Sequence, residues 1–289
     1  MPRPEDTNHL TPVDDMVKMK PGLHIGTSGW SYGEDWVGVF YSSKSSMLEQ
    51  YLTYFNTVEI NSTFYALPKP KFISHLAELV SPSKFFTAKI PKKVTHDHRL
   101  DLSGEGGEIL SQFFELMTPL ISKLPVMLIQ LPPWNIDDMA NLESFLSALD
   151  TRFRYAIEFR HESWLKPTVY SLLERYGVAT VVVDEPKLPI DLRATADFAY
   201  VRWHGHGASP WYRYRYSVAE LEGWVPRIQS LESQSKTVLG YFNNHFYGNA
   251  PLNALQLLQM LNTTDERQEL KLAHMLEKAA AAQSSLDEF

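Results

Sequence analysis

Short runs of β-branched and aromatic residues alternate along the chain with longer segments whose apolar residues fall at helical spacing. Such apolar runs are typical of strands buried on both faces, and the longer segments are typical of helices that cover a sheet. The pattern predicts strands at residues 23–28, 57–63, 85–90, 126–131, 154–159, 178–183, 198–203 and 237–242.

The segments between the predicted strands carry the signals of helices. The first of them has an apolar face formed by Met47, Leu48, Tyr51, Leu52 and Phe55. Ser46 and Glu49 have the spacing of a capping box at its start, and Ser217 and Glu220 have the same spacing before a later helix. The sequence therefore predicts a helix after nearly every strand.

Three segments depart from this alternation. Pro186 and Pro189 interrupt residues 185–197, so no regular helix is expected between the sixth and seventh strands. Residues 264–283 have the pattern of a charged amphipathic helix that ends in an alanine run, which predicts a helix appended to the fold. Residues 1–21 carry no apolar periodicity and are expected to be flexible.

Eight strand-then-helix units in one chain of this length favour a single α/β domain, a (β/α)8 TIM-like barrel. An open doubly wound sheet would more often have fewer strands and a glycine-rich first turn, and the sequence contains no GxGxxG or Walker motif. The expected organisation is a flexible N-terminal segment at 1–21, the barrel domain at 22–263, and an appended C-terminal helix and tail at 264–289.

Composition narrows the class of protein. The 289 residues are 44% hydrophobic and 21% charged, with a formal net charge of −7 at pH 7, which is typical of a globular protein. The acidic balance argues against a protein that coats nucleic acid non-specifically. The sequence has no cysteine, no apolar run of membrane-spanning length and no secretory signal pattern in its first residues. We therefore expect a cytoplasmic protein without a membrane span.

Polar side chains follow almost every predicted strand. In a TIM-like barrel the reactive groups come from the carboxyl ends of the strands and the loops after them. Residues at spacing two face the same side of a strand, and this spacing joins the pairs 59/61, 158/160, 202/204 and 243/245. The sequence therefore predicts a charged barrel mouth formed by Trp30, Glu59, Asn61, Lys89, Gln130, Glu158, Arg160, Asp184, Arg202, His204, Asn243, Asn244 and His245.

This mouth is expected to bind an anion. Lys89, Arg160 and Arg202 are cations, and a guanidinium group suits two-point contact with phosphate or carboxylate. The expected binding set is completed by Trp30, Asn61, Gln130, Asn243 and Asn244. The structural alternative is that Glu59, Glu158 and the three cations only neutralise one another.

Acidic and histidine side chains at the same strand ends suggest catalysis. Glu59 or Glu158 is expected to act as a general base, and His204 is expected to shuttle a proton or bind a metal. Glycoside hydrolysis by the two carboxylates is a weaker alternative, because they lie on the second and fifth strands and no acidic residue ends the fourth or seventh.

A divalent metal is a further alternative. His96 with His98, and His204 with His206, form two HxH motifs that supply ligands together with the acidic strand-end residues and His245. Because HxH motifs occur often by chance, a metal is not favoured. The sequence does not identify a cofactor.

Residues 211–216 alternate aromatic and arginine side chains in the order Trp-Tyr-Arg-Tyr-Arg-Tyr. Such a loop suits stacking on bases or sugars and holding phosphates, while in the structural alternative half of the rings pack beneath the loop. The loop supports the alternative function, a non-catalytic binding module for nucleic acid or an anionic metabolite. The sequence does not indicate an oligomeric state.

Several motifs together resemble one family. They are Gly26-Thr-Ser-Gly-Trp-Ser-Tyr32, Val58-Glu-Ile-Asn-Ser-Thr-Phe-Tyr65, Lys89 with Thr95-His96, Gln130-Leu-Pro-Pro133, Glu158-Phe-Arg160 with Ser163-Trp164, Tyr200-Val-Arg-Trp-His-Gly205, and Phe242-Asn-Asn244 with Gly248-Asn-Ala250 and Asn253-Ala254. In this order, from about residue 23 to 262, the chain resembles the YecE-like family, domain of unknown function 72.

The resemblance implies a TIM-like barrel, in agreement with the strand count, and it brings no established reaction. A likeness of the family's barrel mouth to apurinic endonucleases of the endonuclease IV type would imply chemistry on nucleic-acid phosphates. The histidine and acidic residues are present here, but a three-metal ligand set does not map residue by residue. The prediction is a hydrolase or lyase that acts on a phosphate- or carboxylate-bearing substrate, with nucleotides and nucleic acids among the candidates.

Overall fold

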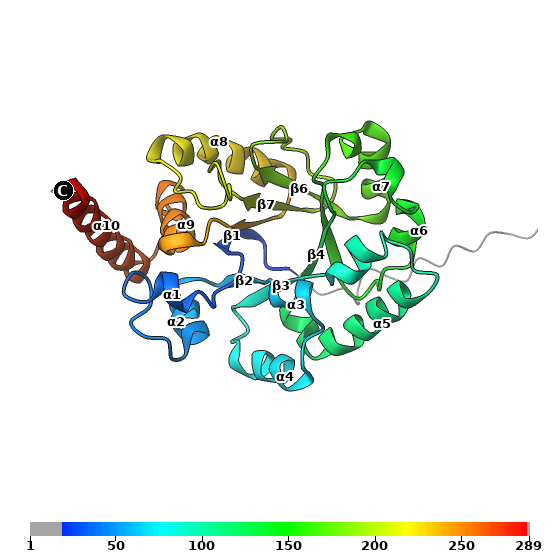
Figure 1. Ribbon diagram of the computed structural model, residues 1–289, viewed down its shortest axis with the longest axis horizontal. Coiled ribbons are helices and arrows are strands. Elements are labelled where there is room, and N and C mark those ends of the chain that lie inside the picture. The colour runs from blue at the N-terminus through cyan, green and yellow to red at the C-terminus, as the bar shows by residue number, and fades with distance from the viewer. Residues whose placement is uncertain (1–18, 288–289) are drawn as a thin grey trace, which may run out of the picture.

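The barrel predicted from the sequence is present. The computed structural model describes residues 19–287, with side chains described for residues 19–281. Parallel strands follow one another in the order β1-β8-β7-β6-β5-β4-β3-β2, and β1 meets β2, so that the barrel is nearly closed (Figure 1). The strands are β1 (Gly22–Thr27), β2 (Thr57–Ile60), β3 (Phe85–Lys89), β4 (Val126–Gln130), β5 (Arg154–Glu158), β6 (Ala179–Asp184), β7 (Phe198–Trp203) and β8 (Thr237–Phe242).

Helices cover the outside of the barrel (Figure 1). They are α1 (Gly33–Trp36), α2 (Met47–Tyr54), α3 (Ser62–Tyr65), α4 (Pro70–Leu79), α5 (Glu105–Met117), α6 (Leu142–Ser147), α7 (Pro167–Tyr176), α8 (Val218–Gln234), α9 (Asn249–Met260) and α10 (Glu266–Asp287). Short 3-10 or π-helical turns lie at Lys93–Asp97, Thr118–Lys123, Ile136–Asp138, Glu162–Trp164 and Phe246–Gly248. As Pro186 and Pro189 predict, no helix joins β6 to β7 in this described part of the chain.

The predicted C-terminal helix is also present. Figure 1 shows α10 projecting from the barrel beside α9. Its Leu272 and Met275 are buried, and Gln268 donates a hydrogen bond to the Tyr54 carbonyl at the end of α2 at 2.6 Å. The helix is therefore attached to the barrel by its first turns.

Two apolar layers hold the barrel together. Side chains alternate along each strand, so that Val181 and Val183 face the barrel axis while Val182 faces the helices. The inner layer is formed by Phe85, Val126, Leu128, Ala156, Ala179, Val181, Val183, Phe198, Tyr200, Leu239 and Tyr241. The outer layer joins the opposite strand faces to the apolar stripes of the helices, and both layers are closed to solvent.

The seam between β1 and β2 is closed by a side chain. The Tyr51 hydroxyl of α2 accepts a hydrogen bond from the Thr27 backbone N–H at 2.9 Å and donates one to the Thr57 carbonyl at 3.1 Å. Gly26 is required beside it, because a Cβ at this position would lie 2.3 Å from the Thr57 carbonyl oxygen. Nearer the mouth the two strands meet at an isolated backbone bridge.

Strand β2 is shorter than the sequence predicts. It ends at Ile60, and the residues from Ser62 onward form α3. The Thr63 hydroxyl turns back to the Ile60 carbonyl at 3.1 Å and also contacts the Lys89 carbonyl at 2.7 Å. A local side-chain bond of this kind competes with the strand ladder, which is why the β-branched residue does not extend the strand.

One of the two predicted capping boxes forms. Ser217 Oγ accepts from the Glu220 N–H at 3.3 Å, and the Glu220 carboxylate accepts from the Ser217 N–H at 2.8 Å, as predicted for α8. The prediction for Ser46 and Glu49 is wrong. Ser46 has φ 48°, in the left-handed region, and a side chain on that backbone makes no cap bond to α2.

The N-terminal end of the described chain is attached to the barrel. Residues 1–18 of the predicted flexible segment lie outside the described residues. Met19 packs against the inner apolar layer, and the Lys20 carbonyl accepts from the Thr237 hydroxyl at 3.1 Å. Within the described range, the structure has no helix with the length and apolar character needed to cross a membrane.

Candidate functional site

The charged residues of the mouth stand directly above the inner apolar layer. Side chains that face the barrel axis occur at every second residue, so Tyr200 of the inner layer is followed by Arg202 and then by His204. In the same way Glu158 at the end of β5 is followed by Arg160. The two-residue spacing in the sequence thus identifies side chains that share the mouth.

The Arg202 guanidinium joins two buried carboxylates. Its Nη1 donates to Glu158 Oε2 at 2.6 Å, and its Nη2 donates to Glu59 Oε1 at 2.7 Å and to Ser28 Oγ at 3.1 Å. Glu59 and Glu158 are 0% exposed, and the second oxygen of Glu59 accepts from the Tyr200 hydroxyl at 2.6 Å. The guanidinium also fills the space between the carboxylates that a sugar would need for glycoside hydrolysis.

A second guanidinium extends this network to the rim of the mouth. Arg160 donates from Nε to Glu158 and from Nη1 to Glu185 at 2.6 Å, while its Nη2 lies 2.9 Å from His204 Nε2. Its side chain is 12% exposed, so it reaches solvent where Arg202 does not. Of the five N–H groups of a guanidinium, two on Arg160 have no acceptor among the described residues. The Arg160 guanidinium therefore retains donors that its described partners do not use.

The network fixes which groups are charged. Burial alone would raise the pKa of Glu158, but the charges of Arg160 and Arg202 outweigh it and hold the pKa well below its usual range. Burial, together with the charge of Arg160, lowers the pKa of His204 to about 3. Burial raises the pKa of Glu185, although Arg160 opposes it. At neutral pH Glu158 is an anion and His204 is a neutral ring.

His204 lies between Arg160 and Asn243. Its Nε2 lies 2.9 Å from Arg160 Nη2 and 3.4 Å from Glu158 Oε1. The side-chain amide nitrogen of Asn243 lies 3.0 Å from its Nδ1. Both ring nitrogens are thus engaged, and His204 orients Arg160.

Lys89 is in the mouth but stands outside the ion-pair network. Its Nζ donates to Gln130 Oε1 at 2.6 Å and lies 4.1 Å from the centre of the Phe64 ring. The residue is 6% exposed, and no carboxylate of the described chain forms an ion pair with it. Burial and the charge of Arg202 lower the pKa of Lys89 to about 7, although the nearby carboxylates oppose the shift. A neutral amine is therefore well populated near pH 7.

Asn61, on the strand next to that of Lys89, adds an unused acceptor. Ile60 pairs with Ala88 across β2 and β3, so Asn61 stands level with Lys89 on the neighbouring strand. The side-chain oxygen of Asn61 is buried and has no hydrogen-bond partner within the described residues. An unpaired buried acceptor is destabilising, which makes this oxygen a natural contact for a hydrogen-bond donor of a ligand.

Two residues of the predicted binding set have other contacts. Asn244 is buried and donates to the Tyr214 carbonyl at 3.0 Å and to Asn253 Oδ1 at 2.8 Å, so it holds the loop after β7 against α9. The Trp30 ring packs beside Phe86 of the outer layer, with 6.4 Å between ring centres. The mouth cluster itself contains Glu59, Asn61, Lys89, Gln130, Glu158, Arg160, Arg202, His204 and Asn243.

Asp184 and His245 do not join the mouth cluster. Val183 faces the barrel axis on β6, so the next residue, Asp184, faces the helices. Its carboxylate accepts from the Trp224 indole at 3.0 Å and lies 2.7 Å from His206 Nε2. His245 comes after the end of β8, where its ring stacks on Tyr32 with 4.4 Å between centres. A polar residue at the end of a strand therefore belongs to the mouth only if the alternation of that strand turns its side chain toward the barrel axis.

The aromatic loop at 211–216 is partly buried, with exposed side chains at Arg213 and Arg215 and a buried one at Tyr216. Tyr216 is 2% exposed and its hydroxyl accepts from the Gly205 N–H at 2.9 Å, while Tyr214 donates to a carboxylate oxygen of the α8 capping box. Tyr212 is half-buried and stacks on His245, with 5.5 Å between centres. Tyr214 and Tyr216 therefore pack beneath the loop, as in the structural alternative for these rings.

The two HxH motifs do not converge on a common point. His96 lies against the Phe64 ring at 5.3 Å, and burial with the charge of Lys89 lowers its pKa to about 4. His98 lies 3.5 Å from a Glu105 oxygen at the start of α5. Among residues 19–281 no group of three His, Asp or Glu side chains has an arrangement that could hold a metal ion.

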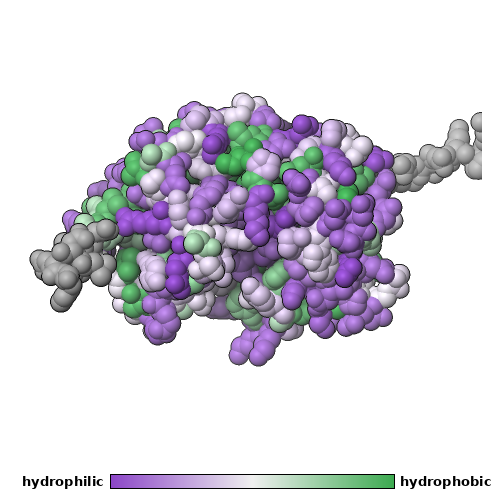
Figure 2. Space-filling view, turned by 45° about the horizontal axis from the view of Figure 1, so that its top comes forward, coloured by the Kyte–Doolittle hydropathy of each residue, from purple (hydrophilic) through white to green (hydrophobic). Residues whose placement is uncertain are grey.

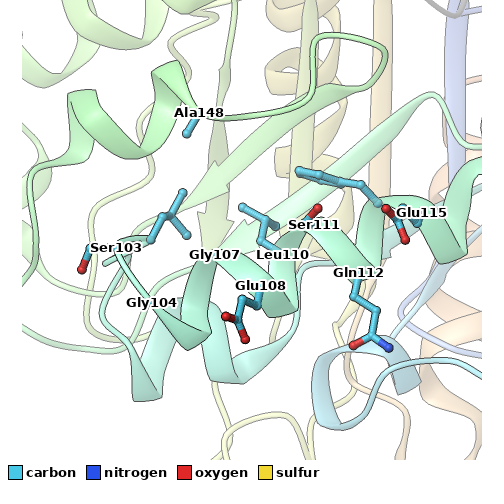
Figure 3. A pocket seen from close by; sticks show the side chains of 11 residues that line it. Ser103, Gly104, Gly107, Glu108, Leu110, Ser111, Gln112, Glu115 and Ala148 are labelled. Atoms are coloured by element: carbon cyan, nitrogen blue, oxygen red, sulfur yellow. The ribbon is translucent and has the colours of Figure 1, made fainter.

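The surface adds little to the chemistry of the mouth. The face in Figure 2 is mainly hydrophilic, with hydrophobic residues in separate groups. A pocket of about 750 Å³ lies outside the barrel along α5, where Figure 3 shows Glu108, Ser111, Gln112 and Glu115, with Ala148 opposite. No strand-end residue lines this pocket, so it is separate from the charged cluster.

Tyr200 and Glu185 bond to members of the mouth cluster and are not among the residues predicted from the sequence. Tyr200 lies two residues before Arg202 and faces the same side of β7, so the spacing that identified His204 could have found it. Glu185 follows β6 in a segment without periodicity, and its position opposite Arg160 carries no signal in the sequence.

A nearly closed ring of parallel strands with carboxylates and guanidinium groups buried at its mouth defines a TIM-like barrel protein with a charged centre. Comparison with known families agrees with this class. The chain belongs to the family described as "Protein of unknown function DUF72", whose model matches residues 24–279.

Named relatives and solved structures support the assignment. The chain is 28% identical over 269 residues to UPF0759 protein YunF of Bacillus subtilis (strain 168), across 83% of this chain and 95% of that protein. It is 27% identical over 209 residues to UPF0759 protein YecE of Escherichia coli (strain K12), across 63% and 74%. The crystal structure of a DUF72 family protein from Thermotoga maritima MSB8 has a TM-score of 0.72 and 33% identity, across 83% of this chain and 99% of that one. The expected family is confirmed, and these names carry no activity.

Proposed function

We propose that this chain is an enzyme whose barrel mouth binds a small substrate by a carboxylate or phosphate group and moves a proton to or from it, in hydrolase or lyase chemistry. The observation that carries the proposal is Lys89, a buried amine near two carboxylates that has no ion pair within the described chain. A purely structural network would neutralise each of its buried charges. This amine is left available for a reaction.

Lys89 is the proposed proton carrier. A general acid or base works best with a pKa near the operating pH, and burial and Arg202 lower the pKa of Lys89 to about 7. The low pKa of Glu158 makes that carboxylate a weak base. Glu158 and Glu59 therefore hold the guanidinium groups and balance positive charge in the mouth, which revises the role of general base that the sequence suggests.

Arg160 is the proposed anchor for the anionic group. Its side chain reaches solvent at the rim and keeps two N–H groups without an acceptor among the described residues. A carboxylate or phosphate can accept hydrogen bonds from them. Half-buried Gln130 and Asn243 contact Lys89 and His204 respectively and complete this side of the mouth. No cofactor is proposed. The absence of cysteine makes the cytoplasm the expected location.

Thermal unfolding in the presence of small anions tests the binding step. The probes are inorganic phosphate, pyruvate, sugar phosphates and mononucleotides. A ligand at about 100 times its Kd stabilises the folded state by about 2.7 kcal/mol, which moves the midpoint by several degrees. We expect the shift to be lost in Arg160→Gln and kept in Arg152→Gln, because Arg152 pairs with Asp150 at the surface. Asn243→Ala, which removes no charge, should weaken the shift.

Turnover tests the catalytic step. Ligands that shift the midpoint are incubated with the protein in D2O and followed by proton NMR, which detects both products and exchange of substrate protons. We expect either signal to disappear in Lys89→Met. Binding without turnover would reduce the proposal to a binding protein, and equal shifts in Arg160→Gln and the parent chain would remove the proposed anchor.

A further inference from the structure

The Lys89 amine is a nucleophile in the mouth, and the side chains around it donate or accept hydrogen bonds. The Lys89 side chain is reached by solvent over 6% of its surface, and its nitrogen uses one of three possible donor contacts, to Gln130 Oε1 at 2.6 Å. The Phe64 ring covers another side at 4.1 Å. An ammonium ion here leaves donors unsatisfied, whereas a neutral amine has a lone pair to offer.

We infer that the Lys89 amine forms an imine with a small carbonyl compound that also carries a carboxylate or phosphate. The inference rests on the proposed function and narrows its substrate class. Desolvated lysines beside another cation are the lysines that proteins use for this chemistry. Arg202 supplies that cation, and it stays in place because Glu59 and Glu158 hold its two ends.

The surroundings suit each stage of the reaction. The charges of Glu59 and Glu158 favour a positive nitrogen, so a protonated imine is stabilised without a carboxylate bonded to it. The free Asn61 oxygen stands level with Lys89 and can accept from the hydroxyl of the carbinolamine that precedes the imine. Arg160 holds the anionic end of the substrate at the rim.

The step balances without an added oxidant or reductant. The amine nitrogen forms a bond to the carbonyl carbon while the carbon–oxygen π bond breaks, and one amine proton moves to the oxygen to give the carbinolamine. The carbon–oxygen single bond then breaks, and the oxygen leaves as water with the second amine proton. A carbon–nitrogen double bond to Lys89 remains.

Reductive trapping tests the inference on the full chain. The protein is incubated near pH 7 with sodium cyanoborohydride and pyruvate, with glyceraldehyde 3-phosphate, or with uncharged dihydroxyacetone, and the adducts are located by peptide mass mapping. Exposed Lys92 in the same molecule is the internal control. At pH 7 an amine with a pKa near 7 is about half neutral, against well under 1% for an ordinary lysine. We expect one of the charged probes to label Lys89 at least about tenfold faster than it labels Lys92. Dihydroxyacetone should label Lys89 more slowly than that charged probe does, because it has no anionic group.

Variants sharpen the outcome. Lys89→Arg should remove the fast adduct and Lys92→Arg should leave it, while Asn61→Ala should slow it. If Lys89→Arg does not fold, the labelling rates of Lys89 and Lys92 within the parent chain still test the inference. Labelling of Lys89 no faster than Lys92 by all three probes would overturn the inference, and turnover with no adduct would overturn it while leaving the proposed function standing. A fast Lys89 adduct without turnover would support the amine chemistry and count against the proposed enzyme.

Discussion

Glu59 and Glu158 belong to strands on different parts of the barrel wall and are held by the two ends of one guanidinium, that of Arg202. The two carboxylates and the guanidinium are all buried. Glu158 is also paired with Arg160, whereas Arg202 is the one cation that forms an ion pair with Glu59 among the described residues, so a change at Arg202 leaves the Glu59 carboxylate buried without a cation.

The first prediction concerns Arg202. Arg202→Met should lower the free energy of unfolding by roughly 3–5 kcal/mol, because its removal leaves the buried Glu59 carboxylate without an ion-pair partner. Arg152→Met, which breaks the surface pair with Asp150, should cost less than about 1 kcal/mol. Urea unfolding of both variants measures the difference. Equal losses would mean that the Arg202 network does not stabilise the barrel.

The second prediction concerns the hydroxyl under Glu59. Tyr200→Phe removes a bond of 2.6 Å to a buried carboxylate and should cost about 1.5–3 kcal/mol. Tyr241→Phe removes a bond of 2.7 Å to the neutral Thr57 hydroxyl and should cost about 0.5–1.5 kcal/mol. Both rings belong to the inner layer, so the pair is matched in burial. A larger loss for Tyr241→Phe would contradict the importance of the charged acceptor.

The third prediction is a dependence of stability on pH. Burial and Arg202 lower the pKa of Lys89 to about 7 in the folded chain, from an ordinary value of 10.5. Between these values the unfolded state binds more protons, so stability should rise with pH, by at most about 1.4 kcal/mol per pH unit. The rise should begin near pH 7 and end near the unfolded pKa.

Unfolding free energies of the parent chain and of Lys89→Met, measured in urea from pH 7 to pH 9.5, isolate this contribution. The parent chain should gain stability relative to Lys89→Met over that range. Two parallel curves would show that Lys89 keeps an ordinary pKa, and the proton-carrier role would then be lost.

The fourth prediction concerns the seam between β1 and β2. Gly26→Ala places a Cβ 2.3 Å from the Thr57 carbonyl oxygen and should destabilise the barrel by roughly 1–3 kcal/mol or more. Gly223→Ala, at a position in α8 with no atom within 4 Å of the new Cβ, should stabilise the chain by roughly 0.5–1 kcal/mol. Thermal midpoints that move in opposite directions would support this account, and a neutral Gly26→Ala would refute it.

The fold was predictable because its signals are local. Buried parallel strands appear as apolar runs, and the predicted runs match the observed strands closely, with β2 as the main exception. The mouth was predictable in part, because every second side chain of a strand faces the barrel axis. This alternation places Glu158 with Arg160, and Arg202 with His204, on the same side of their strands.

The pairing within the mouth could not be predicted. The low pKa of Lys89 comes from its burial in the folded barrel and from the charge of Arg202, which lies far from it in the sequence. Glu185 is positioned by an irregular segment rather than by a periodic element. Asp184 was misplaced because its strand end looks like the others until the alternation of β6 is known.

The closure of the barrel has a consequence for the order in which the chain assembles. β1 emerges first during synthesis, but its ladder partner β8 lies more than two hundred residues later, with Gly22 opposite Thr237. Until β8 arrives, one edge of β1 is unpaired, and on the other edge the Tyr51 hydroxyl is the nearest partner that the nascent chain can supply. We therefore expect helix α2 to contact the first strand before the last strand completes the ring.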